Sequence, residues 1–133
     1  MGERQHRLDP EGRPYDPASL ARKDDVEAAD FFALDLRVGR VVDVEDFPEA
    51  RDPSYRVTVD FGPVIGTLRT SAKITNYTHA ELQDRLVVGA LNLGTRRIAG
   101  FASQFLILGG LAPDGTVHLL EVGAALEPGA PVA

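Results

Sequence analysis

Residues 34–44 read LDLRVGRVVDV, and this stretch decides the class of fold. Apolar residues recur at even positions and charged ones at odd positions, namely Leu34, Leu36, Val38, Val42 and Val44 against Asp35, Arg37, Asp43 and Glu45. This alternation predicts a long strand with one buried face. Gly39 lies in its middle, where a residue without Cβ allows a bulge or bend. One strand could therefore serve both sides of a small barrel.

Two more alternating segments follow a turn-rich link at residues 47–54. Residues 55–61 predict a second strand, closed by Gly62 and Pro63. Residues 68–74 predict a third strand, with apolar side chains on one face and Arg69, Ser71 and Lys73 on the other. The segment 78–81, Thr-His-Ala-Glu, matches a capping box and predicts a short helix ending near Arg85.

The rest of the chain completes a β-rich pattern. Residues 86–92 predict a buried fourth strand, residues 94–97 a loop, residues 103–108 a fifth strand, and residues 116–120 a further one. Five strands with a helix between the third and the fourth is the order of the OB-fold. We therefore predict an all-β, five-stranded OB barrel with N- and C-terminal extensions, a fold that commonly binds oligonucleotides on strands two and three.

The length of 133 residues fits one compact domain. Residues 1–25 are polar and aperiodic, so we interpret them as a partly flexible extension with a short helix from Pro17, capped by Asp16. The domain then covers residues 26–133. The absence of Cys excludes disulfides and thiol chemistry and suits a reducing cytosol. With no apolar leader segment, we expect a cytoplasmic protein without membrane insertion.

The charge is unevenly distributed along the chain. The net charge is −6, from 14 Lys and Arg against 20 Asp and Glu, which disfavours a polyanionic partner. Residues 64–110 nevertheless hold five basic and two acidic residues. An acidic molecule with one basic segment is what a site for a modest anion would look like.

The motifs of common enzymes are missing. The three histidines, His6, His79 and His118, have no metal-ligand spacing, no serine lies in a nucleophile elbow, and no glycine-rich phosphate loop occurs. We expect no catalytic activity, no metal and no cofactor.

Polar residues on the predicted third strand, and from the end of the fourth to the fifth, could instead bind a nucleic acid. These candidates are Arg69, Ser71, Lys73, Asn92, Arg96, Arg97 and Ser103. Cations neutralise phosphates, hydroxyls and amides contact base edges, and an aromatic such as Tyr77, Phe101 or Phe105 can stack on a splayed base. The alternatives are that Phe105 belongs to the core, that Tyr77 covers the helix start, and that residues 96–97 are a solvated loop tip.

Several of these segments resemble the bacterial tRNA-binding domain family, and within it the CsaA-type secretion chaperones. The resemblance rests on residues 34–39, 47–51, 55–63 and 71–75, on Asn92-Leu93 and on Ser103 before an apolar strand. It implies an OB-fold, a homodimer, binding of tRNA or structured RNA, and affinity for unfolded preproteins. It also implies that residues 92, 96, 97 and 103 face tRNA, whereas Asp35, Arg37 and Gly39 hold the barrel together.

Two functional hypotheses remain from the sequence. The first is a non-enzymatic tRNA- or RNA-binding protein. The alternative is a peptide-binding chaperone with an exposed apolar groove, for which the candidates are Phe47, Tyr55, Phe101 and Phe105. For the dimer we expect burial of the apolar C-terminal residues Val117, Leu119, Leu120, Val122 and Leu126, joined by Leu20 and Val26.

Overall fold

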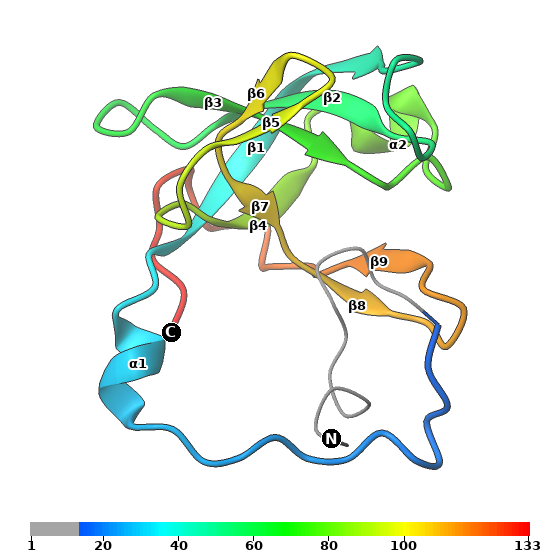
Figure 1. The fold of residues 1–133 in the computed structure, drawn as a ribbon. Helices are drawn as coiled ribbons and strands as arrows, with labels where there is room; N and C mark the ends of the chain where they lie inside the picture. The colour runs from blue at the N-terminus through cyan, green and yellow to red at the C-terminus, as the bar shows by residue number, and fades with distance from the viewer. Residues whose placement is uncertain (1–13) are drawn as a thin grey trace.

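A computed structural model describes residues 14–133, whose main body is a small β-barrel (Figure 1). The elements are α1 (Ala28–Phe32), β1 (Leu36–Asp46), β2 (Tyr55–Asp60), β3 (Thr67–Ala72), α2 (His79–Leu82), β4 (Leu86–Ala90), β5 (Arg96–Ile98), β6 (Phe101–Ser103), β7 (Leu106–Ile107), β8 (Gly109–Leu111) and β9 (Val117–Leu119). Five strands form one sheet in the order β3-β2-β1-β4-β7. The predicted OB-fold, with its helix between the third and fourth strands, is confirmed. His6 and the first half of the predicted extension lie outside the described residues.

Strand β1 pairs with β4 through its first half and with β2 through its second half. The register shifts between Val41 and Asp43, so a bulge lies there and not at Gly39. The bulge reverses the side-chain alternation. Gly39 and Val41 are buried before the bulge and Val44 is buried after it, whereas Val42 is 40% exposed, which corrects the predicted inward position of Val42. Gly39 has another role, because a Cβ there would lie 2.5 Å from Val59 Cγ1.

The barrel closes between β3 and the segment that joins β6 to β7. The Gln104 N–H donates to Arg69 O at 2.8 Å, and the Thr70 hydroxyl donates to Phe105 O at 2.7 Å. Beyond these contacts, β3 and β7 diverge and leave a groove between them. The predicted fifth strand is thus interrupted at residues 104–105 and appears as β6 and β7.

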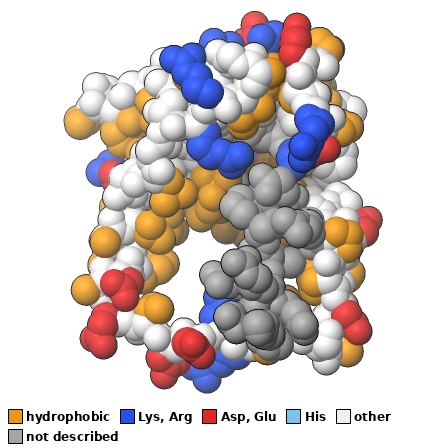
Figure 2. All heavy atoms as spheres, in the orientation of Figure 1, with side chains coloured by type: hydrophobic (Ala, Val, Ile, Leu, Met, Phe, Trp, Pro, Cys, Tyr) orange, Lys and Arg blue, Asp and Glu red, His pale blue; other side chains and the backbone are white. Residues whose placement is uncertain are grey.

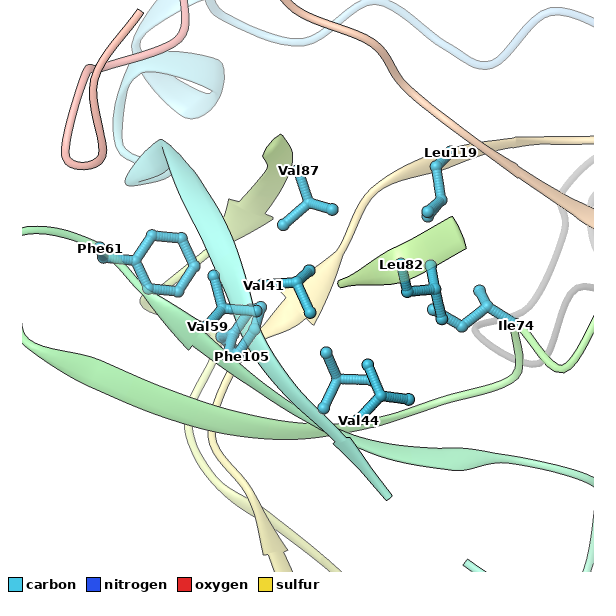
Figure 3. Close-up of a cluster of buried hydrophobic side chains, with 10 residues drawn as sticks. Val41, Val44, Val59, Phe61, Ile74, Leu82, Val87, Phe105 and Leu119 are labelled. Atoms are coloured by element: carbon cyan, nitrogen blue, oxygen red, sulfur yellow. The ribbon is translucent and has the colours of Figure 1, made fainter. Parts of the chain in front are cut away.

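Buried aliphatic and aromatic side chains from all parts of the barrel fill its interior (Figure 3). Phe61 and Phe105 meet edge to face with ring centroids 5.0 Å apart. Leu82, from the capped helix α2, is fully buried and closes one end. Leu119 also belongs to this core, with 7% exposure, so its predicted burial against a second copy is wrong.

Residues 94–97, predicted as a loop, are partly a strand. β5 pairs with β6 in a hairpin whose two turn residues, Ala99 and Gly100, both have positive φ. Two such residues make the turn that matches the twist of a two-residue hairpin. Alanine rarely takes this conformation, so the sequence does not signal the turn.

The N-terminal arm, residues 16–34, is exposed along its whole length and arches away from the barrel (Figure 1). Tyr15 anchors its start, since its hydroxyl donates to Leu111 O at 2.8 Å. Asp16 caps a turn at residues 17–19 and not the predicted helix, while the short helix α1 was not predicted. The C-terminal residues pair with β1, where Val38 N–H donates to Ala130 O at 2.8 Å.

Candidate nucleic-acid interface

Strand β3 presents the predicted polar face. Arg69 and Lys73 are exposed and Ser71 is half-buried, whereas the alternate residues Thr70 and Ile74 are buried. Ser71 lies opposite Arg56 of β2 in the antiparallel register. Arg56 therefore adds a third cation, from the neighbouring strand, to this face.

Ion pairs and ring contacts join five residues at this face into an arginine–aromatic cluster, made of Glu45, Phe47, Arg56, Arg69 and Phe101. The Glu45 carboxylate lies 3.2 Å from Arg69 Nη2 and 3.5 Å from Arg56 Nε. The Arg69 guanidinium lies over the Phe101 ring, 4.7 Å from its centroid, and the Arg56 guanidinium lies 5.2 Å from that of Phe47. The two rings meet edge to face at 5.4 Å.

Two guanidinium groups in this cluster share one carboxylate, so the cluster keeps one excess positive charge. Arg56 Nε is buried and forms no hydrogen bond within the described part of the chain. Phe101 remains half-buried and Arg69 is exposed. The cluster can thus offer a phosphate a charged partner and a base an aromatic edge.

The positive charge of Lys73 is neutralised by Asp52, which lies in the loop between β1 and β2. Its ammonium lies 3.0 Å from Asp52 Oδ2. The hydrogen bond from Lys73, followed by its positive charge, holds the pKa of the Asp52 carboxyl below its ordinary value. An anionic ligand at Lys73 must therefore compete with Asp52.

The two hairpin arginines lie on opposite faces of β5, because adjacent residues of a strand alternate. Arg97 is exposed and donates from Nη1 to Gly100 O at 3.1 Å. Arg96 is exposed and lines a groove with Arg51 and Lys73. The predicted single basic rim is therefore divided between two surfaces.

Asn92 and Ser103 are occupied by contacts within the chain. Asn92 Oδ1 accepts from Asp35 N–H and its Nδ2 donates to Ala33 O, both at 2.8 Å. Ser103 is 8% exposed, and its hydroxyl accepts from Ser71 N–H at 3.0 Å. We assign both side chains a positioning role in this conformation.

Replacing Ser103 by Ala tests this positioning role. The Thr70 hydroxyl donates to Phe105 O, which leaves the Ser103 hydroxyl to donate to Thr70 Oγ1, 3.0 Å away. Ser103→Ala removes that donor and the acceptor for Ser71 N–H. We expect the free energy of unfolding, measured by urea denaturation, to fall by about 1–3 kcal/mol. RNA affinity of the folded variant should be unchanged, and a loss of affinity at parental stability would contradict the assignment.

The structure also places the four aromatic residues proposed for peptide binding. Phe47 is 4% and Phe105 is 5% exposed, so neither can form the exposed apolar patch that was predicted. Tyr55 is half-buried, and its hydroxyl donates to Tyr77 O at 2.8 Å. Phe101 keeps part of its ring accessible, within the arginine–aromatic cluster.

An apolar groove lies elsewhere, between the separating ends of β3 and β7. Its volume is about 470 Å³. Its lining is mostly aliphatic and includes Ile74, Ile98, Leu106, Ile107, Leu111 and Val117. This groove was not predicted, because it depends on where two strands distant in sequence cease to pair.

Arg56 and Arg51 were also absent from the predicted site. Arg56 alternates with Val57 on β2, so its outward position was readable from the sequence. The contact of Arg56 with Phe47 could not be predicted from the sequence, because the loop between β1 and β2 separates the two residues.

The described residues contain no candidate metal site and no candidate membrane-spanning helix. Across residues 14–133, no three His, Asp or Glu side chains gather so that they could hold a metal ion. Over the same range, no helix is long and apolar enough to span a membrane.

Figure 2 shows several Lys and Arg side chains over the barrel, and mostly Asp and Glu side chains along the arm beneath it. The fold and this surface define an OB-type barrel with a basic face and terminal extensions. Residues 36–131 match the model of the putative tRNA binding domain family, and the chain belongs to that family.

Solved structures place the chain with the CsaA-type members. It is 38% identical to the CsaA chaperone of Bacillus anthracis, with a TM-score of 0.78, covering 83% of this chain and 100% of that one. The CsaA chaperone of Picrophilus torridus gives 38% identity and a TM-score of 0.77, covering 82% of this chain and 100% of that one.

The methionine–tRNA ligase of Pyrococcus abyssi is 40% identical over 108 residues, 80% of this chain. The match covers 14% of the ligase, so the chain corresponds to a small part of that enzyme.

Proposed function

We propose that the protein binds tRNA or similarly structured RNA, without catalysing a reaction, through the face of β2 and β3 and the β5–β6 hairpin. The observation that carries this proposal is the arginine–aromatic cluster, in which Arg56 and Arg69 share the single carboxylate of Glu45. Membership of the putative tRNA-binding domain family supports the same ligand.

An RNA phosphate would compete with Glu45 for the two guanidinium groups. Charge-assisted contacts to phosphate are strong and can be bidentate for arginine. The edge of the Phe101 ring could then contact an unpaired base. Because the whole chain has a net charge of −6, binding should be modest and should weaken steeply with salt.

The hairpin contribution can be measured with the double variant Arg96→Ala/Arg97→Ala. We expect weaker binding of labelled bulk tRNA, and a slope of log affinity against log salt that is smaller by about one to two. The measurement is fluorescence anisotropy across a salt series.

The matched control is Arg22→Ala/Lys23→Ala, which makes the same change in net charge on the exposed arm. It should retain the parental slope. An equal loss in both double variants would mean that overall charge, and not the hairpin, sets the affinity.

A second candidate function is binding of unfolded peptide or preprotein segments. The CsaA relatives are named as chaperones, and the aliphatic groove between β3 and β7 gives this candidate a specific surface. It replaces the aromatic set considered from the sequence, of which two members are buried.

We also propose that the protein is a homodimer. Apolar side chains stay exposed on the arm and the C-terminal segment, including Val26 at 73%, Phe32 at 68% and Leu126 at 43%. A two-fold pair would bury them. Sedimentation equilibrium at micromolar concentration tests this, and a sharp monomer would contradict it.

With tRNA as its partner, the protein would act in the cytoplasm.

A further inference from the structure

We propose that the groove between β3 and β7 binds an extended peptide segment as an added strand, and that this segment alternates aliphatic with acidic side chains. The proposal deepens the peptide-binding candidate above and rests on it, and its groove shares Lys73 and Arg96 with the proposed RNA interface. It assigns that candidate a surface, a binding mode and a class of sequence.

The first wall of the groove is an unpaired strand edge. Arg69 N–H donates to Gln104 Oε1 and Ser71 N–H donates to Ser103 Oγ, so the odd residues of this segment direct their backbone groups away from β2. Lys73 continues this alternation. Its N–H and C=O have no hydrogen-bond partner among the described residues.

The opposite wall also presents a free edge. Leu108 N–H donates to Val88 O at 2.8 Å, and β7 pairs with β4 in antiparallel register. Alternation therefore turns the backbone groups of Ile107 away from β4, to the side on which Phe105 O meets Thr70. Two strand edges that have ceased to pair thus face one groove.

An open edge of this kind is a template for an added strand. The groove volume of about 470 Å³ lies within the range of ligand sites. Its aliphatic floor would take aliphatic side chains, and Leu106 is already 44% exposed there.

The rim determines the charge of the partner. Two cationic side chains, Arg51 and Lys73, line the groove against one acidic lining residue, Asp52. The rim therefore has an excess of positive charge. In a bound strand, alternate side chains point to opposite sides, so those that face the floor would be aliphatic and those at the rim acidic.

A labelled ten-residue peptide of alternating Val and Glu is the direct probe, measured by fluorescence anisotropy with the full chain at constant salt. Two control peptides accompany it, one with Lys in place of Glu and one with Pro at two central Val positions. We expect both to bind at least tenfold more weakly, because the first reverses the charge and the second lacks backbone N–H donors. Equal binding of either control peptide, or no binding of the Val and Glu peptide, would overturn the proposal.

The groove is tested by Leu106→Glu, with Leu93→Glu as the matched control. Both positions are exposed, at 44% and 54%, and residue 93 is not part of the groove lining. Thermal unfolding of both variants verifies that they fold. We expect at least tenfold weaker peptide binding for Leu106→Glu and parental binding for Leu93→Glu. Parental peptide binding by folded Leu106→Glu would overturn the proposal.

Titration of the same variants with labelled tRNA separates this proposal from RNA binding. We expect Leu106→Glu to retain the parental affinity for tRNA. If it loses tRNA affinity and the parent binds no peptide, the groove belongs to the RNA interface and the peptide proposal is wrong. If the parent binds peptide but not tRNA, the peptide proposal stands and RNA binding alone fails.

Discussion

Arg69→Glu is expected to lower the affinity for tRNA about tenfold or more at low salt. The substitution removes a guanidinium from the arginine–aromatic cluster and places a second carboxylate beside Glu45. Both changes make the electrostatic potential more negative at the place where an RNA phosphate would bind. Since about one phosphate contact is lost, the slope of log affinity against log salt should also decrease by about one.

The reciprocal variant, Glu45→Gln, should raise the affinity, because it removes the carboxylate that competes with phosphate for Arg56 and Arg69. Arg22→Glu, on the exposed arm, makes the same change in net charge as Arg69→Glu and serves as its control. Equal effects of Arg69→Glu and Arg22→Glu would show that the cluster has no specific role. Anisotropy titrations with labelled tRNA measure all three variants.

Gly39→Ala should lower the free energy of unfolding by about 3 kcal/mol. The added methyl group would lie 2.5 Å from Val59 Cγ1 and 2.7 Å from the Phe61 ring. Both neighbours are fully buried, so neither can move aside without disturbing the core. Urea denaturation measures the change.

Gly123→Ala is the control for this prediction. No atom outside its immediate neighbours lies within 4 Å of a Cβ built at that position. We expect its free energy of unfolding to stay within about 0.5 kcal/mol of the parent. Parental stability of Gly39→Ala would show that the barrel can separate β1 from β2 at low cost.

The sequence predicted features that depend on local patterns. The outward face of β3 followed from alternation, and the Thr78–Glu81 capping box is present, with Glu81 N–H donating to Thr78 Oγ1 at 3.1 Å. Asp35 and Arg37, which the resemblance implied hold the barrel together, form an ion pair at 2.6 Å. In each case the interacting residues are close in sequence.

Features that depend on tertiary packing could not be predicted in this way. The bulge beyond Val41 lies where β1 pairs with β2 after pairing with β4. If the alternation of side chains is continued through the bulge, Val42 is assigned to the wrong face. The arginine–aromatic cluster unites residues of β1, β2, β3 and β6. The groove requires β3 and β7 to separate, which no local pattern encodes.

The most direct test of the account is an amide hydrogen-exchange footprint of tRNA on the full chain. We predict slower exchange, on addition of tRNA, in β2, β3 and the β5–β6 hairpin, with little change in the arm. Protection confined to the arm, or no protection at tRNA concentrations that saturate any binding, would contradict RNA recognition by the basic face of the barrel.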